Sequence, residues 1–138
     1  MAKLRKIDAE TNVITWFEIP VLDSARAKAF YETILDIKMQ TLYMEETNEE
    51  LTFFPSDPKV VQATSGRVSG SLTKSKNAIP SAEGTKVYLN AYPEIDLVLN
   101  RVEKAGGKII VPKMHIRAGL IAVIEDTEGN RIGLHAEQ

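Results

Sequence analysis

The sequence predicts an α+β fold in which a strand, a helix and three further strands occur twice along the chain. Two segments rich in β-branched and aromatic residues, 12–21 and 86–92, each precede a segment whose apolar residues have helical spacing. Shifting the first half by 71 residues aligns strands with strands and helices with helices without a gap. Because either half alone is too small to bury its sheet well, the two βαβββ modules should share one sheet or barrel.

The first module is expected at residues 12–73. After the strand at 12–21, Asp23 or Ser24 can cap a helix, because a side-chain oxygen accepts hydrogen bonds from free backbone N–H groups. Apolar side chains of this helix fall on one stripe: Ala27, Phe30, Tyr31 and Ile34. Three strands should follow it: DIKMQTLYME (36–45), ELTFFP (50–55) and KVVQAT (59–64).

Residues 65–73 are interpreted as the remnant of a strand. A polar linker at 74–84, rich in Ser and Lys, then separates this module from a second one at 85–136. The second helix should end at Gly106 and Gly107, since glycine is favoured just beyond a helix C-terminus. Its apolar stripe is Ile95, Val98, Leu99, Val102 and Ala105. Three strands complete the module, with a loop at 114–118 after the first of them: 108–113, 119–126 and 130–136.

Composition limits the classes of partner. A net charge of -2 argues against general binding to nucleic acid or to anionic membranes, both of which require a basic surface. The chain has no cysteine, which excludes disulfides and thiolate metal sites. No apolar run approaches the roughly 20 residues of a membrane span, and the basic start MAKLRKIDAETN, expected to be a solvated arm, lacks the apolar stretch of a signal peptide. These features predict a cytoplasmic protein.

Three segments carry a resemblance to a known family. WFEIPVLDSARAKAFYETIL, with Asp23 followed by Ala27, Phe30 and Tyr31, looks like the opening of a vicinal-oxygen-chelate domain. DTEGNRIGL resembles the family's turn before its last strand, although Thr127 stands where proline is usual, and VEKAGGKIIVPK is similar to its second helix and next strand. This family, the glyoxalase/bleomycin resistance protein/extradiol dioxygenase superfamily, implies a curved mixed-sheet cup around a ligand site. It also implies a homodimer.

The resemblance implies four metal-ligand positions, two in each module, that usually hold His, Glu or Gln. Here they fall on Trp16 and Val87 in the first strands and on Gln62 and Gly133 in the last strands. Three of these side chains have no lone pair to offer a metal, and Gln62 supplies one neutral oxygen. A catalytic zinc needs about three protein ligands. We therefore expect no metal cofactor at the family's usual site.

Strand alternation brings other residues into the cup, because residues two apart share a face. Glu18 would accompany Trp16, and His135 would accompany Gly133, so that Glu18 and His135 are candidates for an acid/base pair or a displaced metal site. Tyr88 and Asn90 are expected outside the cup or at a dimer seam. The predicted ligand-binding residues are Trp16, Glu18, Gln62, Thr64, Leu89, His115 (in a loop over the cup mouth), Arg131 and His135.

The leading hypothesis is a cytoplasmic, glyoxalase-like protein that binds a small organic molecule in its cup. One alternative is a metal-dependent lyase, isomerase or dioxygenase that acts on vicinal oxygens through Glu18 and His135. Another is a non-catalytic interaction subunit. The sequence leaves open whether the protein is an enzyme, since fold membership alone does not grant an activity.

Overall fold

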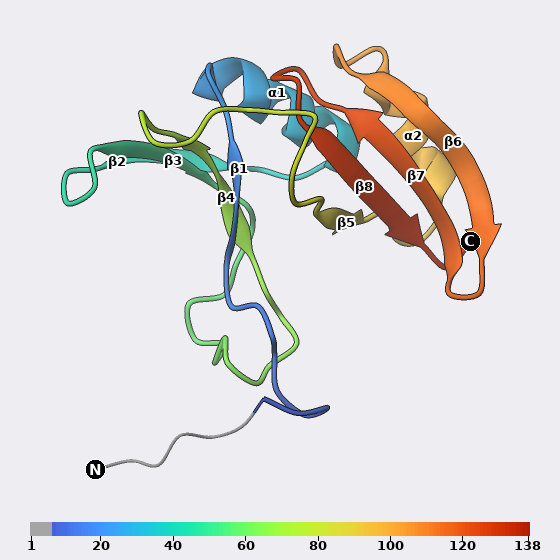
Figure 1. Ribbon diagram of the computed structural model, residues 1–138, viewed down its shortest axis with the longest axis horizontal. Helices are drawn as coiled ribbons and strands as arrows, with labels where there is room; N and C mark the ends of the chain where they lie inside the picture. The colour runs from blue at the N-terminus through green and yellow to red at the C-terminus, as the bar shows by residue number, and fades with distance from the viewer. Residues whose placement is uncertain (1–6) are drawn as a thin grey trace.

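A computed structural model describes residues 7–138 and shows two four-stranded mixed sheets with two helices (Figure 1), which confirms the predicted α+β fold. The basic start of the chain lies largely outside these residues. The elements of the first module are β1 (Phe17–Pro20), α1 (Ser24–Leu35), β2 (Gln40–Met44), β3 (Glu49–Phe53) and β4 (Gly70–Lys74). Those of the second are β5 (Tyr88–Asn90), α2 (Ile95–Val102), β6 (Lys108–Ile116), β7 (Gly119–Glu125) and β8 (Arg131–Ala136).

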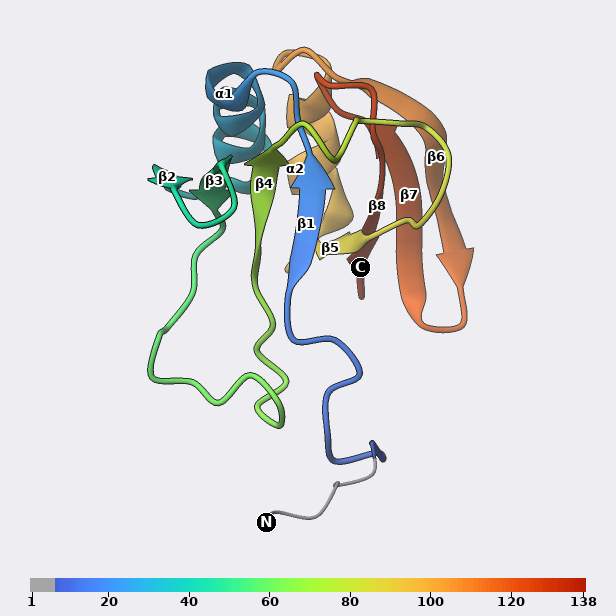
Figure 2. The same ribbon diagram turned by 60° about the vertical axis from the view of Figure 1, so that its left-hand side comes forward.

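The two sheets have the same topology, with orders β1-β4-β3-β2 and β5-β8-β7-β6. In each, the first strand of the module pairs in parallel with the last, and the remaining pairs are antiparallel. Each sheet is covered by one helix, because α1 contacts β3 and β4 and α2 contacts β6, β7 and β8. Figure 2 shows α2 behind β1. We call the sheet surface turned away from the helices the open face of each sheet.

Both helices pack against the sheets through the predicted apolar stripes. The side chain of Asp23 accepts a hydrogen bond from the Arg26 backbone N–H at 3.0 Å and so caps α1. The side chains of the two stripes, with Ile19 and Leu72 from one sheet and Leu89 and Leu134 from the other, form a single buried cluster. The two modules therefore share one hydrophobic core. No helix within residues 7–138 is both long enough and apolar enough to cross a bilayer.

The strand predicted at residues 59–64 is wrong, whereas the strand remnant expected just before the linker corresponds to β4. Residues 59–64 form turns, and β4 begins only at Gly70. The turns are tied to the N-terminal segment, where Asn12 bonds to the backbone of Gln62, Ala63 and Gly66. The apolar residues of KVVQAT do not make a strand because this long connection projects from the body of the molecule, away from the sheet (Figure 1).

This difference changes the correspondence between the modules. Leu72 in β4 and Leu134 in β8 both face the shared core, so the neighbour of Leu72 that matches Gly133 is Ser71. The strand pairing agrees, since Ser71 lies opposite Glu18 and Gly133 lies opposite Tyr88. Gln62 is therefore not the counterpart of Gly133. The shift of 71 residues fails at this strand because the connection before β4 is longer than the one before β8.

The predicted orientation of β5 is also wrong. Leu89 is only 7% exposed and belongs to the core, together with Ala91. Because side chains alternate along a strand, Tyr88 and Asn90 lie on the open face. The apolar residues of β5 therefore pack into the core between the sheet and the helices, and not into the cup.

Candidate functional site

A cavity of about 410 Å³ lies on the open face of the second sheet. Tyr88 and Asn90 reach it from β5, and His135 reaches it from β8. Ile116 from β6 and Ile121 from β7 complete its apolar wall. The cavity thus combines an apolar surface with a few polar groups, the usual character of a small-molecule site.

The ring of Tyr88 occupies the space in front of Gly133. A Cβ atom at Gly133 would lie 2.6 Å from Cε2 of Tyr88 and 2.7 Å from its Cγ, closer than real Cβ contacts. The ammonium of Lys86 lies 5.4 Å from the centroid of the same ring, within the range of a cation–π interaction. Glycine at this position therefore makes room for an aromatic side chain where metal-dependent relatives are expected to present a ligand.

The residues at these positions do not fit a divalent metal. With Ser71 in place of Gln62, the expected positions hold Trp16, Ser71, Val87 and Gly133, and the strand partners of Ser71 and Gly133 are Glu18 and Tyr88. Only Glu18 among these residues is a common ligand of catalytic metals. Within residues 7–138, no group of three or more His, Asp or Glu side chains is arranged to hold a metal ion.

The first open face is arranged differently. Nε1 of Trp16 lies 3.3 Å from Oε2 of Glu18, and its ring packs edge-on against Phe53 with centroids 6.0 Å apart. Ser71 and Thr73 are buried, and their hydroxyl oxygens lie 2.9 Å apart. The polar groups of this face thus bond mainly to one another.

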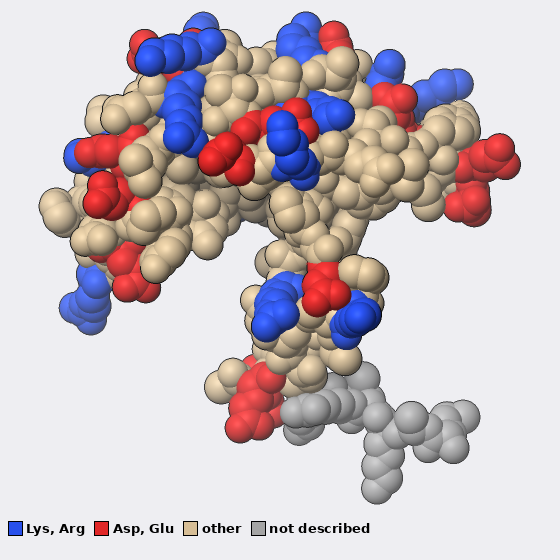
Figure 3. Space-filling view, turned by 180° about the vertical axis from the view of Figure 1, so that it is seen from behind, with Lys and Arg blue, Asp and Glu red and all other residues tan. Residues whose placement is uncertain are grey.

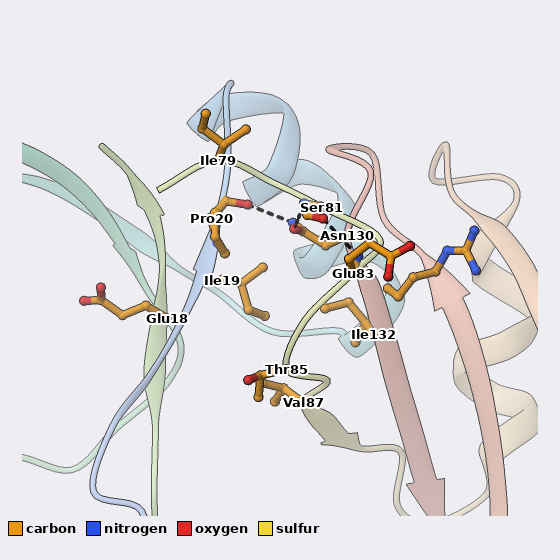
Figure 4. Close-up of a pocket in the computed structure, with 11 residues that line it drawn as sticks. Glu18, Ile19, Pro20, Ile79, Ser81, Glu83, Thr85, Val87, Asn130 and Ile132 are labelled. Atoms are coloured by element: carbon orange, nitrogen blue, oxygen red, sulfur yellow. Dashed lines mark hydrogen bonds between the residues drawn. The ribbon is translucent and has the colours of Figure 1, made fainter. Parts of the chain in front are cut away.

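Glu18 and His135 do not form one site in the chain. Glu18 bonds to Trp16 on the first sheet, whereas Nε2 of His135 bonds to the carbonyl oxygen of Ala118 at 2.7 Å on the second. Glu18 lines a cavity between the modules, as does Arg131, but Figure 4 shows its carboxylate turned away from β8. The proposed acid/base pair is therefore not assembled by the fold of one chain.

Of the other predicted ligand-binding residues, Leu89 also lines the cavity around His135, although it is 7% exposed and belongs to the core. Gln62 and Thr64 lie in the projecting connection. His115 is part of strand β6 instead of a loop over the cup, because the strand continues to Ile116. Its strand partner Leu120 faces the core, so His115 lies on the sheet face opposite the cavity.

Arg131 lies at the edge of a second cavity of about 260 Å³, between β1, β8 and the connection 79–87 (Figure 4). The connection is held there by Asn130, which accepts a hydrogen bond from Ser81 N at 3.1 Å and donates one to the Pro20 carbonyl at 2.8 Å. Nε of Arg131 lies 3.7 Å from a carboxylate oxygen of Glu125. This cavity therefore separates the two modules, and Arg131 does not line the site around His135.

The acidic turn before β8 joins the modules. Oδ1 of Asp126 accepts hydrogen bonds from the backbone N–H groups of Glu128 and Asn130, and Oδ2 accepts one from the Tyr31 hydroxyl at 2.6 Å. The buried carboxylate of Glu128 accepts two hydrogen bonds from the guanidinium of Arg26, at 2.6 and 3.0 Å. The turn thus fixes the second module to the start of α1.

This network shifts three pKa values, and the hydrogen bonds to Glu128 raise that of Arg26. Burial alone would raise the pKa of Glu128, but hydrogen bonds from Arg26 and from the backbone of Asp23 and Leu22 outweigh it and lower the pKa to about 2. Burial, reinforced by the charge of Asp126, raises the pKa of Tyr31 well above its usual value. Both carboxylates of this turn, those of Asp126 and Glu128, accept hydrogen bonds from residues of the first module. The role of the turn is therefore structural.

The packing of Tyr88 against Gly133 can be tested by a double-mutant cycle. Gly133→Ala should lower the free energy of unfolding by about 1 kcal/mol, because the partly exposed ring must move aside for the new methyl group. In a Tyr88→Ala background the same change should cost almost nothing, which urea denaturation will show. Equal costs in the two backgrounds would mean that the ring does not occupy this space.

Charges of both signs are mixed over the surface. Figure 3 shows lysine and arginine side chains beside aspartate and glutamate on the face seen from behind. This distribution agrees with the small net charge of -2. Because the charges are mixed, the chemistry of a ligand is better inferred from the hydrogen-bonding groups around His135 than from the overall electrostatic field of the protein.

Comparison with known proteins identifies related sequences and folds. A sequence model of the Glyoxalase/Bleomycin resistance protein/Dioxygenase superfamily matches residues 13–134. A glyoxylase/bleomycin resistance protein/dioxygenase domain from Frankia sp. EAN1pec has a similar structure, with a TM-score of 0.65 and 15% identity, covering 92% of this chain and 98% of that chain. No functionally curated protein matches the sequence.

Two glyoxalase I structures are also similar. The trypanothione-dependent enzyme from Leishmania major has a TM-score of 0.62 and 19% identity, over 91% of this chain and 87% of that chain. A glyoxalase I mutant from Zea mays has a TM-score of 0.60 and 16% identity, over 88% of this chain but only 46% of that chain. The chain therefore spans about half the length of the maize enzyme. At these identities the likeness shows the fold.

Proposed function

Because the chain belongs to the glyoxalase/bleomycin resistance protein/dioxygenase superfamily, we propose that it binds a small organic molecule on the second open face without a metal anchor. The observation that carries this proposal is the ring of Tyr88 in front of Gly133, beside a cavity of about 410 Å³. The fold keeps the family's position for a ligand site, but an aromatic wall replaces a metal ligand there.

The residues around the cavity support binding of an uncharged, partly apolar molecule. Tyr88, Ile116 and Ile121 supply apolar surface, and Asn90 and His135 supply hydrogen bonds. A pocket with a few placed polar groups in an apolar wall gives both affinity and orientation. We assign binding to this site and no catalytic step, because Glu18 lies on the other sheet.

The proposal includes a homodimer. Both open faces lie on the surface of one chain, and large apolar side chains are exposed on the second, including Ile116 at 39% and Tyr88 at 44%. A second copy that covered an open face would remove this surface from water and enclose the cavity. We also place the protein in the cytoplasm, which is consistent with a chain that has no cysteine.

Binding can be mapped by NMR on ¹⁵N-labelled protein in the presence of EDTA, with a library of small neutral aromatic compounds. Ligand-induced shifts should cluster at the backbone amides of Tyr88, Asn90, Ile121 and His135. Tyr88→Ala should weaken binding about tenfold through loss of apolar contact, whereas Tyr43→Ala, on the first sheet, should not change it. Shifts confined to the first sheet, or no binding at all, would contradict the proposal.

A further inference from the structure

The hydrogen bonds already made by Asn90 define what it can offer a ligand. Its Oδ1 atom accepts a hydrogen bond from the backbone N–H of Tyr92 at 2.9 Å. This bond fixes the amide orientation, since only the oxygen can accept. Within the described residues the NH₂ group of Asn90 has no hydrogen-bond partner, and Asn90 lines the cavity. Asn90 therefore presents a donor.

His135 presents the opposite group. Its Nε2 lies 2.7 Å from the carbonyl oxygen of Ala118. A carbonyl oxygen can only accept, so Nε2 must carry the hydrogen. In a neutral imidazole the other ring nitrogen, Nδ1, then has a free lone pair. The carbonyl of Ala118 thus selects the tautomer that leaves His135 with an acceptor.

The strand pairing places these two residues side by side. Asn90 in β5 lies directly opposite His135 in β8, and neighbouring strands are about 4.8 Å apart. Both residues project from the same face, into a cavity whose wall is formed by Tyr88, Ile116 and Ile121. A donor and an acceptor therefore stand next to each other at an apolar surface.

We propose that the ligand of this site carries an acceptor and a donor on one edge, as in a primary carboxamide or a lactam, on a small apolar body. Its carbonyl oxygen accepts from the Asn90 NH₂ group, and its N–H donates to Nδ1 of His135. A carboxylate offers two acceptors and an ester offers no donor, so both leave His135 unpaired. This inference rests on the proposed binding function and specifies the class of ligand.

The test compares 2-naphthamide with methyl 2-naphthoate, which has a similar size but lacks the N–H donor. Isothermal titration at pH 8 should give the amide about tenfold higher affinity, the difference expected for one well-placed hydrogen bond. Asn90→Asp keeps an oxygen for Tyr92 N but removes the donor, and His135→Leu removes the acceptor. Asn90→Asp should weaken binding of both probes, because both carry the carbonyl oxygen that accepts from Asn90, whereas His135→Leu should abolish the preference for the amide.

His135→Gln provides a conservative variant, because a glutamine amide can donate to the Ala118 carbonyl and still present an oxygen to the ligand. It should keep a preference for the amide that His135→Leu loses. His115→Leu, on the opposite face of the sheet, is the matched control and should behave like the unaltered protein.

Equal affinity of the unaltered protein for both probes would overturn the proposed ligand class. If Tyr88→Ala then weakened both probes, the proposed binding function would stand without it. A preference that survives His135→Leu, or binding of both probes that Asn90→Asp leaves unchanged, would also overturn the ligand class. Binding of neither probe would contradict the ligand class and the binding function together.

Discussion

Asp126→Ala should lower the free energy of unfolding by about 3–4 kcal/mol. The carboxylate of Asp126 accepts hydrogen bonds from two backbone N–H groups, from the Tyr31 hydroxyl and from the side chain of Asn130. Asp126 is only 3% exposed, so its removal leaves several buried donors without a partner, and each such group costs about 1–3 kcal/mol. The loss should be seen as a lower urea midpoint in circular dichroism.

Asp96→Ala is the matched control for this experiment. Asp96 forms an ion pair of 2.7 Å with Lys113, but both side chains are about half exposed. Exposed ion pairs contribute at most about 1 kcal/mol. A loss at Asp126 no greater than that at Asp96 would show that the turn before β8 does not hold the two modules together.

The second large effect is a loss of stability in acid that depends on Glu128. The pKa of this residue is about 2 in the folded protein and 4.5 for the free group. Because the folded value is the lower one, the stabilisation is fully present above pH 4.5 and is lost as the pH falls from 4.5 to 2. After allowance for solvent screening at the exposed partner Arg26, it amounts to about 2 kcal/mol.

Glu128→Gln should remove this part of the pH dependence. The variant should be less stable than the unaltered protein at pH 7, and the difference should shrink toward pH 2 as Glu128 becomes protonated. Urea denaturation at intervals between pH 7 and pH 2 measures it, with Glu83→Gln in the exposed connection as control. A constant difference across this range would mean that the charge of Glu128 does not stabilise the fold.

Much of the fold could be predicted because its signals are local and repeated. The helical spacing of Ala27, Phe30, Tyr31 and Ile34 sets the buried face of α1, and Asp23 caps that helix as expected. The order of strand, helix and three strands also holds in both modules. KVVQAT was misassigned because its apolar pattern resembles that of a strand, whereas bonds to Asn12, far away in the sequence, hold it in turns.

The candidate site could be predicted only in part, because an error of one residue reverses the two faces of a strand. Val87, Leu89 and Ala91 alternate with Tyr88 and Asn90. That alternation indicates that Val87, Leu89 and Ala91 face the core. From it alone, Tyr88 and Asn90 could have been assigned to the open face. His135 was found from its relation to Gly133. Its tautomer depends on Ala118, a contact that the sequence does not reveal.

The measurement that tests the central claim most directly is the affinity of metal-free protein for 2-naphthamide, repeated after addition of Zn, Ni, Mn or Fe(II). Metal content of the purified protein is determined first, and EDTA-treated protein serves as the starting point. The proposed site around Tyr88 and Gly133 predicts the same affinity with and without each metal. Binding that appears only after a metal is added, and disappears again in Glu18→Gln, would contradict a metal-independent site.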